Sequence, residues 1–179
     1  MRYESIADIY SANQKIREYF TATVSRISTD EASVLPEGEK WTIQQNAEHV
    51  AMVDIGAARI CSKLLNEART AGNLSEGGIA ASPEFSEKLA SIASAKFEAP
   101  ERVQPTGTVT ISEAVERMKA NVAVFEAMRS DLEKFDLSLP KFPHPFFGDM
   151  TATEWLIVAG GHEMRHTKQI ERLLEKIRQ

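Results

Sequence analysis

The chain contains a single cysteine, Cys61, among its 179 residues. One cysteine cannot form a disulfide within the chain, so the sequence gives no sign of an oxidising compartment. The first residues, MRYESIADIYSANQ, lack the apolar run of a signal peptide. No segment approaches the roughly 20 consecutive apolar residues that a membrane span needs. We therefore expect a cytoplasmic protein that is not inserted in a membrane.

Basic residues are also scarce. The 21 Lys and Arg residues are outnumbered by 26 Asp and Glu, which gives a formal net charge of −5. Proteins that bind nucleic acid or anionic membranes neutralise phosphates with clustered Lys and Arg, and no such cluster is present. Nucleic acid and membrane surfaces are therefore not expected as partners. The length suits one globular domain, residues 1–179.

Convincing strand alternation is missing as well. Apolar residues instead recur at three- and four-residue steps in long segments, which is typical of amphipathic helices. The predicted helices cover about residues 5–27, 43–71, 111–132 and 152 to nearly the C-terminal end. A shorter helix is expected within SPEFSEKLASIASAKF, with Ser82 as its cap and Pro83 at its first position.

Capping signals support three of these helix starts. Thr42, Thr110 and Thr151 are each followed three residues later by Gln or Glu, which is the pattern of a capping box. Gly72 is a plausible stop for the second long helix. Four long amphipathic helices predict an all-α protein, a four-helix bundle. The stretch from Gly72 to Val109 is long enough to be a crossover connection.

The string His162-Glu163-Met164-Arg165-His166 matches the H-E-x-x-H signature of zinc proteases. Two histidines four residues apart lie on one helix face, where both rings can reach one ion. A protease, however, needs a third ligand downstream. The thirteen residues after His166 contain no histidine, and Glu171 and Glu175 only continue the same helix. The sequence therefore argues against a protease.

A third histidine, His49, occurs in the first two turns of the second long helix. If that helix adjoins the last one, His49 completes a three-histidine set with His162 and His166. Three histidines with an open position are the layout of a catalytic metal site. The alternative is that all three are ordinary core histidines satisfied by carboxylates or backbone. Gly160 and Gly161, two glycines inside a helix, indicate space for a neighbouring helix or for a ligand pocket.

These motifs together resemble the DinB / YfiT-like superfamily of metal-dependent hydrolases. The resemblance is carried by the turn His144-Pro145-Phe146-Phe147-Gly148, by H-x-x-x-H followed by Gln169-Ile170, and by one histidine early in the second helix. It implies a four-helix bundle with a crossover and a divalent metal held by His49, His162 and His166. Zinc or nickel are the expected ions, with iron or manganese as further options. The resemblance also implies a homodimer.

Four other residues each have more than one possible role. Glu163 could act as a base beside the metal, or be a charge that faces solvent or another helix. Gln45 and Gln169 could orient ligand imidazoles, although Gln45 also fits the capping box and Gln169 could cap a neighbouring helix. His144 could line the pocket mouth or serve as a fourth ligand, or simply shape its turn.

Three functions remain open from the sequence. The first is a metal-dependent enzyme, either a hydrolase or a thiol-dependent S-transferase that acts on a small-molecule substrate with a low-molecular-weight thiol. The second is a non-catalytic bundle that binds metal or a small molecule. The third is a dimerisation module in which the histidines belong to the core.

Overall fold

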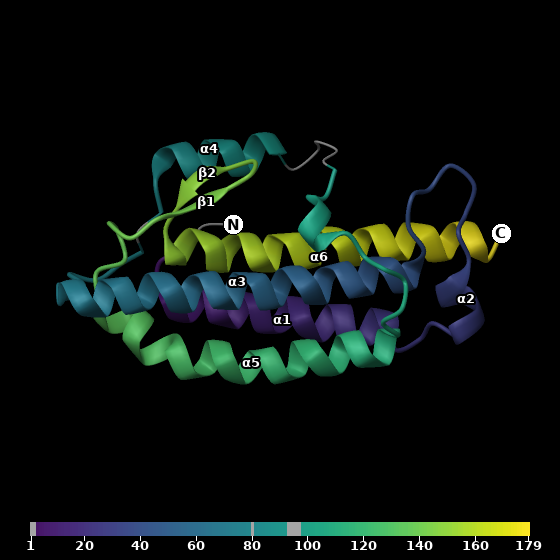
Figure 1. Ribbon diagram of the computed structural model, residues 1–179, viewed down its shortest axis with the longest axis horizontal. Coiled ribbons are helices and arrows are strands. Elements are labelled where there is room, and N and C mark those ends of the chain that lie inside the picture. Colours follow the sequence, from purple (N-terminus) through teal and green to yellow (C-terminus); the bar gives the residue numbers. More distant parts are fainter. Residues whose placement is uncertain (1–2, 80, 93–97) are drawn as a thin grey trace.

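The computed structural model of the chain describes residues 3–79, 81–92 and 98–179. Four long helices lie side by side and form its frame (Figure 1). They are α1 (Ile6–Val24), α3 (Ile43–Ala71), α5 (Ile111–Lys134) and α6 (Ala152–Ile177). The smaller elements are α2 (Thr29–Ser33), α4 (Pro83–Ile92), the 3-10 helix η1 (Glu101–Val103) and the antiparallel strands β1 (Phe142–His144) and β2 (Gly148–Met150). The predicted all-α four-helix bundle is confirmed.

Around the bundle, α6 packs between α1 and α3, and α5 packs against α3 and α1. Helices α3 and α5 run in the same direction, because Asp54 bonds to Asn121 near their middles and Arg69 pairs with Asp131 near their C-terminal ends. Two parallel neighbours need a connection that returns along the bundle. Residues 72–110 form this crossover, which passes α6 in Figure 1.

The helix starts follow the capping pattern of the sequence. Thr42, Thr110 and Thr151 each accept a backbone N–H from the residue three positions later, and that residue's side chain accepts the threonine N–H in return. These bonds satisfy donors that a helix N-terminus leaves free. Gly72 ends α3 in the left-handed conformation, with a φ of 74°. All four signals were read correctly from the sequence.

Four small elements were not predicted, namely α2, η1, β1 and β2. Helix α2 has one turn, and the hairpin strands β1 and β2 have three residues each, which is too short for any periodicity to show. The short helix expected after Ser82 exists as α4, and the Ser82 hydroxyl accepts the N–H of Phe85 at 3.0 Å. The last part of that prediction, residues 93–97, lies outside the described residues.

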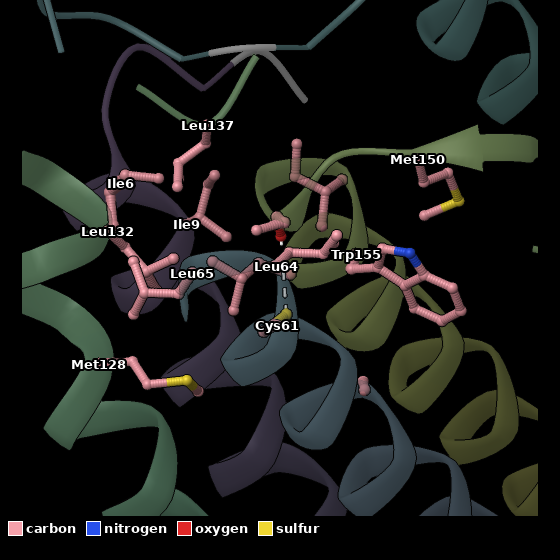
Figure 2. Packing of buried hydrophobic residues seen from close by; sticks show 14 of the residues in the cluster. Ile6, Ile9, Cys61, Leu64, Leu65, Met128, Leu132, Leu137, Met150 and Trp155 are labelled. Carbon is pink, nitrogen blue, oxygen red and sulfur yellow. Dashed lines mark hydrogen bonds between the residues drawn. The ribbon is translucent and has the colours of Figure 1, made fainter. Parts of the chain in front are cut away.

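Apolar side chains fill the bundle in two clusters. Figure 2 shows the one beside the hairpin, where Ile9 of α1, Leu64 of α3 and Trp155 of α6 meet. Cys61 is fully buried in this cluster, and its sulfur lies 3.6 Å from the carbonyl oxygen of Ala152. The second cluster, around Phe20, fills the other end. Among the described helices, none combines the length and apolar character needed to cross a bilayer.

The two helix-interior glycines differ in their surroundings. A Cβ atom on Gly160 would lie 2.0 Å from the Oδ1 atom of Asn13 on α1, so only glycine allows this close approach of α1 and α6. Asn13 uses the approach to donate its side-chain amide to the carbonyl of Leu156 at 3.0 Å. A Cβ on Gly161 would meet nothing within 4 Å. Gly160 is therefore needed for helix packing, whereas Gly161 faces open space.

Candidate metal centre

Three histidines come together where α3 and α6 pack against each other. His49 lies in the second turn of α3, and His162 and His166 lie one turn apart on α6. One ring nitrogen of each lies within 4.8 Å of the corresponding nitrogens of the other two. The Nε2 atoms of His49 and His162 are 3.0 Å apart. The sequence expectation that His49 faces the H-x-x-x-H pair is met.

Hydrogen bonds fix the protonation of two of these rings. The Nδ1–H of His49 donates to the carbonyl oxygen of Val103 in η1 at 2.7 Å. His166 donates its Nδ1–H to the Oδ1 of Asn46 at 3.1 Å. The amide of Asn46 cannot be turned over without loss, because its NH₂ group already donates to the carbonyl of Thr42 at 2.9 Å. Both histidines therefore direct an unprotonated Nε2 toward the cluster.

The donor set fits a divalent ion. Ligand nitrogens around a tetrahedral zinc lie about 3.3 Å apart, given zinc–nitrogen bonds of about 2.0–2.1 Å. The 3.0 Å separation of the His49 and His162 Nε2 atoms is close to this value. A hydrogen bond from His162 to His49 would give the same spacing without an ion. What distinguishes the cluster from such a pair is the third ring, His166, whose centroid is 4.5 Å from that of His162.

Burial keeps the cluster neutral. It lowers the pKa of His49, lowers that of His166 to about 3, and lowers that of His162 well below its ordinary value. The neighbouring rings lower the pKa of His162 and His166 further, because a positive charge on one ring disfavours a charge on the next. Neutral imidazole is the form that binds metals, so the site does not have to lose protons at neutral pH.

Trp41 forms one wall of the centre. Its ring centroid lies 4.8 Å from that of His49 and 6.3 Å from that of His166, to which it is nearly parallel. Trp41 itself is half-buried. An aromatic face at this place limits the access of water to two of the rings.

The crossover segment is fastened to α3 next to His49. Glu48 is buried, and its carboxylate accepts the hydroxyl of Thr106 and the N–H of Gly107, both at 2.7 Å. Gln44 donates to the carbonyl of Gly107 at 2.8 Å. We call residues 98–110 the strap. The clamp at Glu48 holds the strap where it presents the Val103 carbonyl to His49.

Neither Asn46 nor Val103 was identified as a site residue from the sequence. Asn46 is an amide on the buried face of a predicted helix, three residues before His49, and a buried amide needs partners. That signal was available. Val103 acts only through its backbone carbonyl, so no feature of its side chain could have indicated the role.

Gln45 and Gln169 are the two side chains that the sequence offered for orienting ligand imidazoles. The side chain of Gln45 accepts the N–H of Thr42, which is the capping role. Gln169 is half-buried on α6, but the His166 nitrogen that it was expected to orient is held by Asn46. The role of Gln169 stays a prediction.

His144 shapes its turn and is not part of the three-ring cluster. Its Nδ1 accepts the backbone N–H groups of Phe146 and Phe147 at 3.2 and 3.3 Å. Burial, with a smaller effect from Arg102, lowers the pKa of His144 to about 4. The ring is therefore neutral at pH 7, with its hydrogen on Nε2. A protonated Nε2 cannot bind a metal, so this arrangement contradicts the fourth-ligand reading.

Glu163 points away from the histidines. Its position is about 100° around α6 from His162, and its carboxylate accepts the Nε–H of Arg17 on α1 at 2.7 Å. Arg17 also pairs with Asp54 of α3 at 2.6 Å. Glu163 is buried in this network. The geometry goes against the base role and matches the other reading, a charge that faces a neighbouring helix.

Two depressions on the described surface lie outside the cluster. One, of about 520 Å³, lies between η1 and the hairpin and is bordered by Arg102 and His144. The other, of about 630 Å³, lies along the outer face of α3, from Arg59 to Thr70. We regard the smaller one as relevant to the site, because it borders the strap that holds His49.

The bundle and the three imidazoles define a class of protein: helical bundles with a three-histidine group able to hold a metal ion. The family model of the DinB superfamily matches residues 12–170, and the chain belongs to this superfamily. The resemblance noted in the sequence is thereby confirmed.

Two individual proteins are similar to this chain. The uncharacterised protein YuaE of Bacillus subtilis (strain 168) is 25% identical over 160 residues, which cover 84% of this chain and 88% of that protein. Among solved structures, TT2238, described as a four-helix bundle protein, matches with a TM-score of 0.62 and 20% identity, over 94% of this chain and 99% of that one. At this identity the second likeness supports the fold alone.

Proposed function

We propose that the protein binds one divalent metal ion through His49, His162 and His166, and that it is a metal-dependent hydrolase or thiol-dependent S-transferase. The observation that carries the proposal is the convergence of three ring nitrogens within 4.8 Å of one another on two helices. The hydrogen bonds from Nδ1 of His49 and His166 support it, since they leave Nε2 free on both rings. Zinc or nickel suits three imidazoles best, although ligand type alone does not choose.

A bound divalent ion would supply Lewis acidity and lower the pKa of a coordinated water or thiol. The chain's own residues would supply the positioning. Val103 and Asn46 hold two imidazoles in one tautomer and one orientation, as outer partners of metal-binding histidines usually do. Trp41 shields two of the rings from water.

Metal content of protein purified without an affinity tag tests the site. We expect close to one equivalent of zinc or nickel in the wild type and almost none after the triple change of His49, His162 and His166 to Ala. His144→Asn is the matched control and should keep its metal, because that histidine lies outside the cluster. Equal, low metal content in the wild type and the triple variant would mean that the histidines only belong to the core.

Turnover separates an enzyme from the alternative of a non-catalytic binder. Metal-loaded protein would be assayed with simple esters, and with small electrophiles together with glutathione, bacillithiol or mycothiol. We expect turnover in at least one assay, and its loss in His49→Ala. Stoichiometric metal without turnover in any assay would favour the binder.

A further inference from the structure

The depression between η1 and the hairpin is lined by three prolines and by two side chains that can donate hydrogen bonds. It has a volume of about 520 Å³ and is lined by Pro100, Glu101, Arg102, Pro143, His144 and Pro145. Prolines have a fixed φ angle, so the three of them hold the walls in place. Glu48 fastens the same strap to α3 further along the chain, at Thr106 and Gly107.

None of the three histidines lines the depression, but one residue on each of its walls leads toward them. Arg102 directly precedes Val103, whose carbonyl accepts the hydrogen bond from His49. On the other wall, the ring of His144 lies 5.0 Å, centroid to centroid, from that of Trp155. Trp155 is on α6 two turns before His162 and on the same face of the helix. A molecule at the cluster could therefore extend into the depression.

The two donors suit an anion. Arg102 carries a permanent positive charge and is exposed. The Nδ1 of His144 is occupied by two backbone N–H groups, which leaves Nε2–H free to donate. A guanidinium on one wall and an imidazole N–H on the other are groups that bind carboxylate and phosphate oxygens. Glu101, also at the rim, opposes an anion and should weaken the binding.

We propose that this depression binds an anionic group, a carboxylate or a phosphate, of the molecule that reacts at the three-histidine site, with Arg102 and His144 as the recognition residues. The link to the reacting molecule rests on the proposed function, whereas the anion site itself can be tested without any metal.

The first test is a titration of the metal-free protein with inorganic phosphate, followed by the amide resonances of residues 101–103 and 144–148 in ¹⁵N NMR. We expect saturable shifts at these amides. Arg102→Gln should weaken binding about tenfold, because it removes the charge-assisted bonds. Glu101→Gln should tighten it. His144→Asn should weaken it several-fold, since an Asn oxygen can replace Nδ1 as acceptor for the turn but the Nε2–H is lost. Shifts that do not saturate, or that are unchanged in Arg102→Gln, would refute the anion site.

The second test uses protein loaded with cobalt(II), whose thiolate charge-transfer band reports thiol binding. We compare mercaptocarboxylates of two to six carbons with mercaptoalcohols of the same lengths. At least one carboxylate should bind about tenfold more tightly than its alcohol, and Arg102→Gln should abolish the preference. Equal affinities across the series would overturn the link between the depression and the metal site. Failure to bind cobalt would instead count against the proposed function, and the phosphate titration would still decide the anion site.

Discussion

At the scale of single residues, Asn46 shows that the three histidines alone do not define the geometry of their site. The side chain connects the start of α3 to His166 on α6. Its NH₂ group donates to the backbone carbonyl of Thr42, and its Oδ1 accepts from the imidazole of His166. Because the ligand ring has only one free nitrogen left, the amide selects the tautomer that can bind an ion.

Replacing Asn46 should therefore weaken metal binding without removing a ligand. We expect Asn46→Ala to lower zinc affinity about 10–100-fold, the usual cost of losing an outer partner of a metal-binding histidine. Asn46→Asp keeps the acceptor and should stay closer to the wild type. Gln45→Ala is the control: it removes a capping bond beside the site and should lower stability, not zinc affinity. Competition with a chromogenic chelator gives the affinities, and wild-type affinity in Asn46→Ala would show that the amide is dispensable.

The neighbouring glycines of α6 also differ as single residues. Gly160→Ala should destabilise the protein by about 1–3 kcal/mol, because its Cβ would collide with Asn13. Gly161→Ala should be neutral or stabilising by up to about 1 kcal/mol, since alanine favours helix and the site is open. Chemical denaturation measures both. If Asn13→Ala relieves most of the cost of Gly160→Ala in the double variant, the collision is the cause.

At the scale of elements, the strap is the part of the crossover connection that contacts the three-histidine site. Its position on α3 depends on the carboxylate of Glu48, which is 3% exposed and bonded to Thr106 and Gly107. The strap in turn places the Val103 carbonyl where it accepts the hydrogen bond from His49. The strap, which the chain needs to connect α3 with α5, thus also orients the ring of His49.

Glu48→Gln tests this linkage. A glutamine cannot accept both strap hydrogen bonds, because one of its terminal groups is a donor. We expect faster amide hydrogen exchange in residues 103–107 and a loss of zinc affinity of about tenfold. Glu48→Ala should enlarge both effects. Faster exchange with unchanged zinc affinity would mean that the strap does not position His49.

At the scale of the whole molecule, one buried network joins all four long helices. Arg17 of α1 pairs with Asp54 of α3 and Glu163 of α6, and it donates to the carbonyl of Met118 in α5. Asn121 of α5 donates to Asp54 at 2.7 Å. Burial raises the pKa of both carboxyl groups, and the charge of Arg17 opposes the rise.

Removing Arg17 should leave two buried carboxylates without their cation. We expect Arg17→Met to lower the free energy of unfolding by about 3–5 kcal/mol at pH 8. The variant's carboxyl pKa values should rise further above their unfolded values. A carboxyl group whose pKa is raised in the folded state makes the protein less stable as the pH rises. The loss of unfolding free energy in the variant should therefore be smaller at pH 5 than at pH 8. Denaturation of metal-free protein at both pH values measures it, and a deficit independent of pH would contradict this explanation. The triple variant in which Asp54 and Glu163 also become Leu should recover much of the loss.

The sequence by itself determined the helices, their capping boxes and the shared face of His162 and His166. These features depend on local hydrogen bonds and on the helical period, which short stretches of sequence carry. It also indicated His49 as the third ring, but only on the condition that two distant helices meet.

Only the tertiary structure shows that these two helices, α3 and α6, meet. The antiparallel packing of α3 and α6 brings together residues more than a hundred positions apart, and it gives His49 and His166 their partners in Val103 and Asn46. The packing also pairs Glu163 with Arg17, whereas the H-E-x-x-H motif suggested that Glu163 could act as a base. The reason is physical: which face of a helix meets which neighbour depends on the packing of the whole bundle, and no local pattern records it.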